Sequence, residues 1–153
     1  MKPVRINLSE RGTPTAREAG SSPAARRILI VEDNFFVADQ CERALTEAGH
    51  QVVGIVATAE QALEVMPDRK PDLVLMDIFL AGARDGIDAA RDVFERFGVR
   101  SIFVSAAFDL AMRNRAEEAQ PLGWLPKPFS DGKLVATVRA AIEDLAAQPA
   151  VVR

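Results

Sequence analysis

The chain has 153 residues, 48% of them hydrophobic and 27% charged, with a formal net charge of −3, which fits one globular domain with flanking tails. One cysteine and one histidine exclude an internal disulfide and a zinc site of the Cys/His type. The N-terminal region has no apolar run long enough for a signal peptide or a membrane span, so we expect a cytoplasmic protein without membrane insertion.

Residues 1–26 predict a basic, disordered tail, because proline, glycine and serine punctuate them and large apolar residues are few. Residues 1–27 carry a net charge of +4. Their basic residues are scattered and have no aromatic residue between them, so we expect no direct DNA binding. Val4, Ile6 and Leu8 alternate as in a short strand, which leaves open a small arm that docks on a sheet edge.

From residue 27 onward, short apolar runs alternate with helical patterns. The predicted strands cover residues 28–31, 52–56, 73–76, 102–104 and 124–125. The helices predicted between and after them run from about 36 to 48, from 58 to near Pro67, from 87 to 97, over 109–120 and from 130 to 145. Strands apolar on both faces and separated by helices predict an α/β domain over 27–147, doubly wound, with a parallel sheet covered on both faces. A short tail at 148–153 follows.

Four of the predicted strands end in polar residues, which are Glu32 with Asp33, Asp77, Ser105 and Lys127. In an open parallel sheet, sites form at the carboxyl ends of the strands, near the point where the strand order reverses. A single aspartate at a strand end says little, since aspartate also caps helices. Three acids, a hydroxyl and a lysine together predict one polar crevice.

The residue types in this crevice favour phosphoryl chemistry. Clustered carboxylates repel one another, and a hard divalent cation such as Mg²⁺ relieves that repulsion. Asp77, alone on the middle strand, is the expected nucleophile, and its attack on a phosphoryl group gives an acyl phosphate. We expect Ser105 to donate a hydrogen bond to a phosphate oxygen and Lys127 to supply positive charge opposite the metal.

Short motifs around these residues resemble the receiver domain of bacterial two-component response regulators. They are VEDN at 31–34, MDIFL at 76–80, Ser105-Ala106 after a strand, and Lys127-Pro128-Phe129. The resemblance implies a flavodoxin-like, five-stranded sheet in the order 2-1-3-4-5. Pro126 and Pro128 separately favour an edge position for the last strand, because proline is tolerated there.

The resemblance also implies roles for individual residues. Asp77 is then the phospho-acceptor, and Asp33 and Asp77 are direct ligands of Mg²⁺, with Mn²⁺ as a substitute. Glu32 is a ligand through water, and the backbone carbonyl of Phe79 is a further ligand. The Lys127–Pro128 peptide bond is expected to be cis.

A switching mechanism follows from the same resemblance. Ser105 and Trp124 stand in the places of the switch hydroxyl and the switch aromatic, which alter the surface of the fourth helix, fifth strand and fifth helix. Residues 103–108 are similar to the FATGUY group of stand-alone receivers. That similarity implies that Phe108 shares the switching role and that the partner kinases are of the HWE type. Phe35, Phe36 and Phe79 are expected to be packing residues.

We therefore expect a single-domain response regulator that takes a phosphoryl group from a histidine kinase or phosphotransfer protein and signals through a protein contact. It would catalyse only its own phosphorylation and dephosphorylation. A phosphate sink and a binding module that works without phosphorylation, with Trp124 as a fixed plug, remain open. An aspartyl-phosphate phosphatase is disfavoured, since Phe79 stands where that class has its second acid.

Overall fold

A computed structural model describes residues 25–148 of the chain. The predicted tail at 1–26, with its alternative arm of Val4, Ile6 and Leu8, lies almost wholly outside the described residues. The same holds for most of the tail at 148–153.

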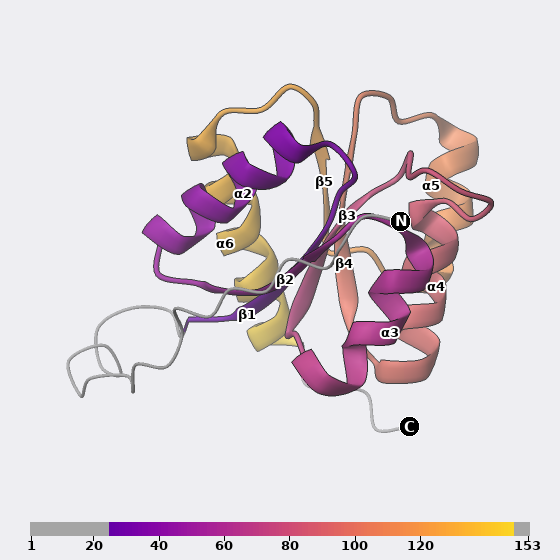
Figure 1. The fold of residues 1–153 in the computed structure, drawn as a ribbon, viewed down its shortest axis with the longest axis horizontal. Helices are drawn as coiled ribbons and strands as arrows, with labels where there is room; N and C mark the ends of the chain where they lie inside the picture. Colours follow the sequence, from indigo (N-terminus) through magenta and orange to yellow (C-terminus); the bar gives the residue numbers. More distant parts are fainter. Residues whose placement is uncertain (1–24, 149–153) are drawn as a thin grey trace.

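Five parallel strands form one sheet in the order β2-β1-β3-β4-β5 (Figure 1). The strands are β1 (Arg27–Val31), β2 (Gln51–Val56), β3 (Leu73–Asp77), β4 (Arg100–Ser105) and β5 (Gly123–Pro126). The predicted strand order is therefore confirmed, and β5 lies at an edge, where Pro126 costs no ladder hydrogen bond within the sheet. The central strands β1 and β3 are neighbours, which places their carboxyl ends side by side.

Helices cover both faces of the sheet, as predicted (Figure 1). Two helices pack on one face, α2 (Phe35–Glu47) and α6 (Asp131–Ala147). The other face carries α3 (Ala59–Arg69), α4 (Gly86–Phe97) and α5 (Leu110–Ala116), with a 3-10 turn at Glu117–Ala119. Among the helices of residues 25–148, none combines the length and apolar character needed to cross a lipid bilayer.

The sheet separates two hydrophobic clusters. Because successive side chains of a strand point to opposite faces, Ile28 and Ile30 of β1 lie in the cluster under α2 and α6. Leu29 and Val31 lie in the cluster under α3 and α4. Both faces of the central strands are therefore buried, and the polar residues of the crevice come after the buried stretch of each strand.

Each helix begins with a capping side chain soon after the strand before it ends. The five capping residues, whose side chains accept hydrogen bonds from backbone N–H groups of the first turn, are Asn34, Thr58, Asp85, Asp109 and Ser130. Such caps stabilise a helix end by satisfying donors that have no partner within the helix. The caps fix where each helix starts relative to the carboxyl end of the sheet.

Gly86, the first residue of α4, lies against the end of β3. Its N–H donates to the carbonyl of Ile78 at 2.8 Å, and a Cβ atom at this position would overlap the backbone carbonyl of Asp77. Only glycine allows so close an approach of two backbones. The start of α4 is thus packed directly on the backbone of the predicted nucleophile.

The helix predicted to end near Pro67 ends at Arg69, with Pro67 in its last turn, and Lys70 closes that turn by donating its N–H to Met66. A different expectation about local structure was wrong. Phe35, Phe36 and Phe79 were expected to pack, but they are 59%, 81% and 53% exposed.

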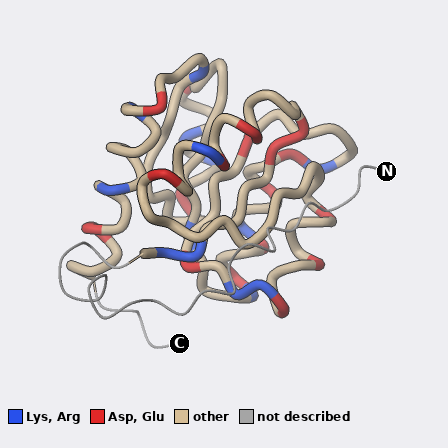
Figure 2. The backbone as a smooth tube through the Cα atoms, turned by 60° about the vertical axis from the view of Figure 1, so that its left-hand side comes forward, with Lys and Arg blue, Asp and Glu red and all other residues tan. Residues whose placement is uncertain are grey.

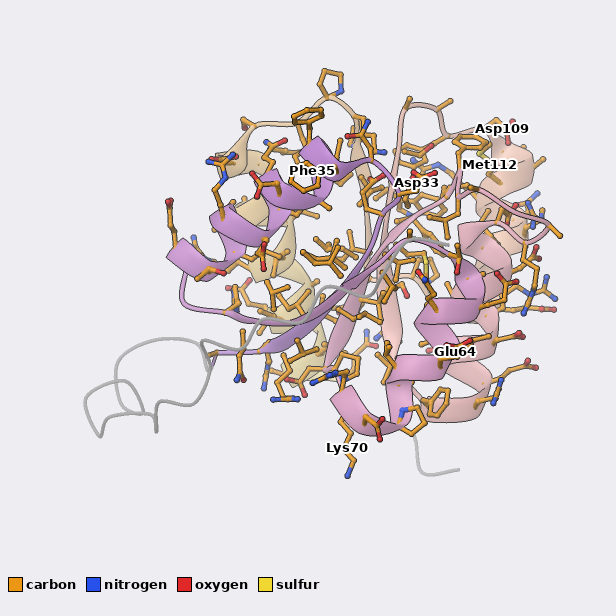
Figure 3. All side chains as sticks on the ribbon, viewed as in Figure 1. Asp33, Phe35, Glu64, Lys70, Asp109 and Met112 are labelled. Atoms are coloured by element: carbon orange, nitrogen blue, oxygen red, sulfur yellow. The ribbon has the colours of Figure 1, made fainter. Side chains whose placement is uncertain are left out.

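The exposure of these phenylalanines follows from their place in the fold. Phe35 and Phe36 occupy the first turn of α2, next to the loop that carries Asp33, and Phe79 follows β3. Figure 3 shows Phe35 and Asp33 at one end of the sheet, the end opposite Lys70. The rings of Phe35 and Phe36 contact each other edge to face at 5.6 Å, so they pack on one another and not on the core.

Candidate functional site

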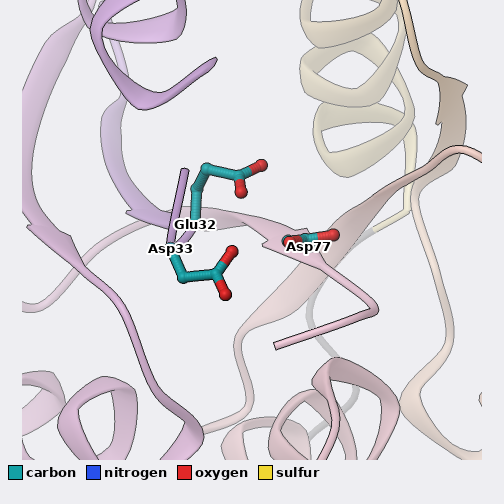
Figure 4. Close-up of side chains that lie close together, drawn as sticks. All are labelled: Glu32, Asp33 and Asp77. Carbon is teal, nitrogen blue, oxygen red and sulfur yellow. The ribbon is translucent and has the colours of Figure 1, made fainter. Parts of the chain in front are cut away.

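Three carboxylates meet at the carboxyl ends of β1 and β3. One carboxylate oxygen from each of Glu32, Asp33 and Asp77 lies within 4.8 Å of the others, and Figure 4 shows the three side chains lying close together. Glu32 is 6% and Asp77 is 3% exposed. Buried carboxylates repel one another strongly unless a positive charge lies between them.

Lys127 supplies such a charge. Its Nζ atom lies 2.9 Å from Glu32 Oε1 and 3.5 Å from Asp77 Oδ1. Burial works against charge on this lysine, but Glu32 and Asp77 outweigh it, so its pKa is raised. The lysine follows the edge strand β5, and the Lys127–Pro128 bond after it is cis, the isomer that the resemblance implies.

The carboxyl group of Asp77 lies in surroundings that disfavour its charge. Its pKa is raised from 3.8 to about 7, first by burial and then by the neighbouring Glu32, while Lys127 acts in the opposite direction. A strongly shifted carboxyl group in contact with specific charged partners is typical of functional sites.

The donor set of this cluster fits a hard divalent cation. Carboxylate oxygens are the ligands that Mg²⁺ and Ca²⁺ prefer, and three of them lie close enough to share an ion. The loop after β3 also comes close, since the N–H of Phe79 donates to Asp77 Oδ1 at 3.3 Å. The ligand role of the Phe79 carbonyl remains a prediction.

Ser105 ends β4, beside the end of β3. Its hydroxyl donates to the carbonyl of Ala107 at 3.0 Å and accepts from the N–H of Ala107 at 3.2 Å. The side chain is fully buried. Ser105 is thus next to the acidic cluster, but its hydroxyl is bonded to its own loop and not to the carboxylates.

Trp124 and Phe108, the predicted switch aromatics, form one aromatic group with Phe103. The ring of Trp124 lies 5.0 Å from that of Phe103 and 5.1 Å from that of Phe108. The guanidinium of Arg113 lies 4.6 Å from the Trp124 ring centre, a distance typical of cation–π contact. Two of the three rings come from neighbouring strands, because Phe103 of β4 pairs with Trp124 of β5.

Two residues of this region escaped prediction from the sequence. Arg113 covers Trp124, and Gln40 of α2 donates hydrogen bonds to the segment that follows Lys127. Sequence periodicity indicates which face of a helix is buried, but it does not indicate which distant residue a polar side chain will meet. The available signal for Gln40 was weak: a polar residue between the buried positions Ala38 and Cys41.

Cys41 of α2 is a buried free cysteine. Burial raises the pKa of its thiol to about 12, and the charge of Glu32 adds to this effect. A thiol that holds its proton so firmly is a poor nucleophile.

Comparison with known protein families agrees with this geometry. Residues 28–139 match the family model of the response regulator receiver domain. The chain belongs to this family. Receiver domains are signalling proteins, and the match covers the whole sheet except Arg27, the first residue of β1.

Two curated relatives illustrate the similarity. The transcriptional regulatory protein PdtaR of Mycobacterium tuberculosis is 32% identical over 117 residues, which cover 76% of this chain and 57% of PdtaR. The phyllosphere-induced regulator PhyR of Methylorubrum extorquens is 33% identical over 129 residues, covering 82% of this chain and 48% of PhyR. The chain thus spans about half the length of the curated relatives it matches.

Solved structures show the same receiver fold. The signal receiver domain of a modulated diguanylate cyclase from Desulfovibrio desulfuricans superposes with a TM-score of 0.73 at 31% identity, over 79% of this chain and 96% of that one. The response regulator PhyR from Brucella abortus gives a TM-score of 0.69 at 29% identity, over 81% of this chain and 50% of that one.

Proposed function

We propose that this receiver domain accepts a phosphoryl group on Asp77 in a Mg²⁺-dependent reaction. The observation that carries the proposal is the meeting of Glu32, Asp33 and Asp77 within 4.8 Å, with the Lys127 ammonium on two of them. Glu32 and Asp77 are buried with a single lysine between them, and such unbalanced buried charge costs stability, which favours a functional reason for the cluster.

Each residue has a chemical part in the proposal. Glu32, Asp33, Asp77 and the Phe79 carbonyl would hold Mg²⁺ or Mn²⁺, which offsets negative charge on the phosphoryl oxygens. An oxygen of Asp77 attacks phosphorus, the bond from phosphorus to the donor's leaving atom breaks, and an acyl phosphate forms. Lys127 then pairs with a phosphate oxygen, and the Ser105 hydroxyl turns from Ala107 to donate to another.

The donor would be a histidine kinase or a phosphotransfer protein. The output would be contact with a target protein through α5, β5 and α6, the face that the resemblance associates with switching. Figure 2 shows basic and acidic positions interspersed along the described chain, and the proposal includes no direct contact with DNA. A receiver domain that serves as a phosphate sink would be phosphorylated on Asp77 in the same way but would bind no target protein.

Phosphorylation can be tested with small phosphate donors. The protein is incubated with Mg²⁺ and acetyl phosphate, and its intact mass and Trp124 fluorescence are followed. We expect one added phosphoryl group in the wild type and in Asp39→Asn, which removes an exposed carboxylate of α2. Asp77→Asn should gain none. Equal labelling of Asp77→Asn and the wild type contradicts the proposal.

A second candidate function rests on the surroundings of Trp124. Its ring is held among Phe103, Phe108 and Arg113, which favours a fixed aromatic plug and a binding module that works without phosphorylation. The same experiment separates the two. Labelling with a change in Trp124 fluorescence supports the phospho-switch, and labelling with no change supports a fixed surface.

A further inference from the structure

The four-residue segment between β5 and α6, residues 127–130, determines where the Lys127 ammonium lies. At its start, the N–H of Lys127 donates to the carbonyl of Ser105 at 2.8 Å. Pro128 has no N–H to contribute. At its end, Ser130 caps α6 through its side chain. The middle of the segment therefore depends on contacts from outside.

Gln40 of α2 supplies such a contact. Its Nε2 atom donates to the carbonyl of Phe129 at 3.0 Å and to Oδ1 of Asp131 at 3.0 Å. These two hydrogen bonds place this turn of α2 against the lysine segment. One side chain thus ties both the segment and the start of α6 to the helix behind the acidic cluster.

We infer that Gln40 is a positioning residue for Lys127, an inference that rests on the proposed phosphoryl transfer to Asp77. Lys127 Nζ is closer to Glu32, at 2.9 Å, than to Asp77, at 3.5 Å. If the segment were looser, the Lys127 ammonium would move toward Glu32. It would then lie too far from Asp77 to bind an oxygen of the phosphoryl group. By holding the Phe129 carbonyl, Gln40 keeps the lysine between the two carboxylates.

A simpler role is that Gln40 only joins α2 to α6, which pack on the same face of the sheet. The two roles differ in what they affect. A purely structural tie changes the free energy of unfolding and leaves phosphate binding unchanged in the folded protein. A positioning role weakens the binding of a phosphate mimic, and it does so only while Lys127 is present.

The test uses Gln40→Met, which keeps the side-chain length without the donors, and Gln40→Glu, which replaces the amide donor by a charge that repels Asp131. Arg43→Met on the same helix is the matched control, because within residues 25–148 Arg43 pairs with Asp39, one turn away on α2. Beryllofluoride binding at saturating Mg²⁺ is measured by the ¹⁹F NMR signal of bound fluoride. Mg²⁺ binding alone is measured separately, and thermal unfolding verifies that each variant is folded.

We expect both Gln40 variants to raise the beryllofluoride midpoint about 3- to 10-fold, as for the loss of one or two hydrogen bonds. The Mg²⁺ midpoint should change by less than about 2-fold, since the metal ligands are untouched. In metal-free protein, amide exchange at Lys127, Phe129 and Ser130 should become faster than in the wild type. The control should match the wild type in all three measurements.

A double-mutant cycle with Lys127→Met separates the two roles. If Gln40 acts through Lys127, Gln40→Met adds no further weakening once the lysine is gone. An unchanged midpoint in the Gln40 variants, or equal weakening with and without Lys127, overturns the inference and leaves phosphorylation of Asp77 standing. A wild-type protein that binds no beryllofluoride overturns the proposed function, and the inference with it.

Discussion

Asp77 combines a proposed chemical role with a cost to stability. Its carboxyl group is buried beside Glu32, so its pKa is raised from 3.8 to about 7. The folded protein therefore binds the proton of Asp77 more tightly than the unfolded chain does. The stability gained in this way is fully present below the unfolded pKa and is lost as the pH rises toward the folded pKa.

It follows that Asp77→Asn, which keeps the shape but carries no charge, should be more stable than the wild type in metal-free solution. We expect a gain of roughly 1–3 kcal/mol at about pH 8, shrinking as the pH falls to about 4. Urea unfolding monitored across this range measures it. Asp39→Asn, which changes an exposed carboxylate, should show no such pH-dependent gain. A less stable Asp77→Asn at pH 8 would mean that the pair with Lys127 outweighs burial.

At the scale of the elements, the junction between β3 and α4 is the tightest constraint on the site. Gly86→Ala would force its Cβ against the carbonyl of Asp77, so α4 or the strand end must move. We expect a loss of about 2–3 kcal/mol in the free energy of unfolding, as in other overpacked positions. Mg²⁺ binding should weaken as well, because Asp77 shifts with its backbone.

Gly132→Ala is the matched control for this prediction. Gly132 lies in the first turn of α6, and a Cβ there would meet only Ser130 Oγ, at 4.0 Å. We expect this substitution to be neutral or to stabilise by up to about 1 kcal/mol, since alanine is the better helix former. If the two alanine variants lost the same free energy of unfolding, the junction between β3 and α4 would have space for a Cβ atom, and the prediction would be wrong.

The elements also show what the sequence could and could not predict. Strand positions followed from short apolar runs, and helix starts from capping residues such as Thr58 and Ser130, because both signals are local. The exposure of Phe36 was missed, because it lies in the first turn of α2, next to the loop that carries Asp33. Gln40 was missed because its partners, Phe129 and Asp131, lie 89 and 91 residues away.

At the scale of the whole molecule, the site joins residues from separate parts of the chain. Glu32 and Asp33 follow β1, Asp77 ends β3, and Lys127 follows β5. The alternation of strands and helices was sufficient to predict that these residues converge, since parallel strands end at one edge. The bonding of the Ser105 hydroxyl to its own loop could not be predicted, because it depends on the path of the backbone after β4.

A cation that binds only when these distant parts are assembled must stabilise the whole fold. A ligand at 100 times its dissociation constant adds about 2.7 kcal/mol to the free energy of unfolding. We therefore expect Mg²⁺ to raise the melting temperature of the wild type and of Asp39→Asn at constant ionic strength. Asp33→Asn should lose most of this rise. The same rise in Asp33→Asn as in the wild type, measured by calorimetry, would place the ion elsewhere.

The contact between Gly86 and the carbonyl of Asp77 has a consequence for how this protein can diversify. We expect substitutions of Gly132 and of the exposed Phe36 to change the free energy of unfolding little. Position 86, in contrast, admits no side chain unless β3 and α4 separate. The acidic cluster restricts the site through charge, and this position restricts it through shape alone. In a library of all single substitutions screened for phosphorylation, substitutions of Gly86 should therefore abolish activity as often as substitutions of Asp77. Gly86 nevertheless bears no chemical group that could react.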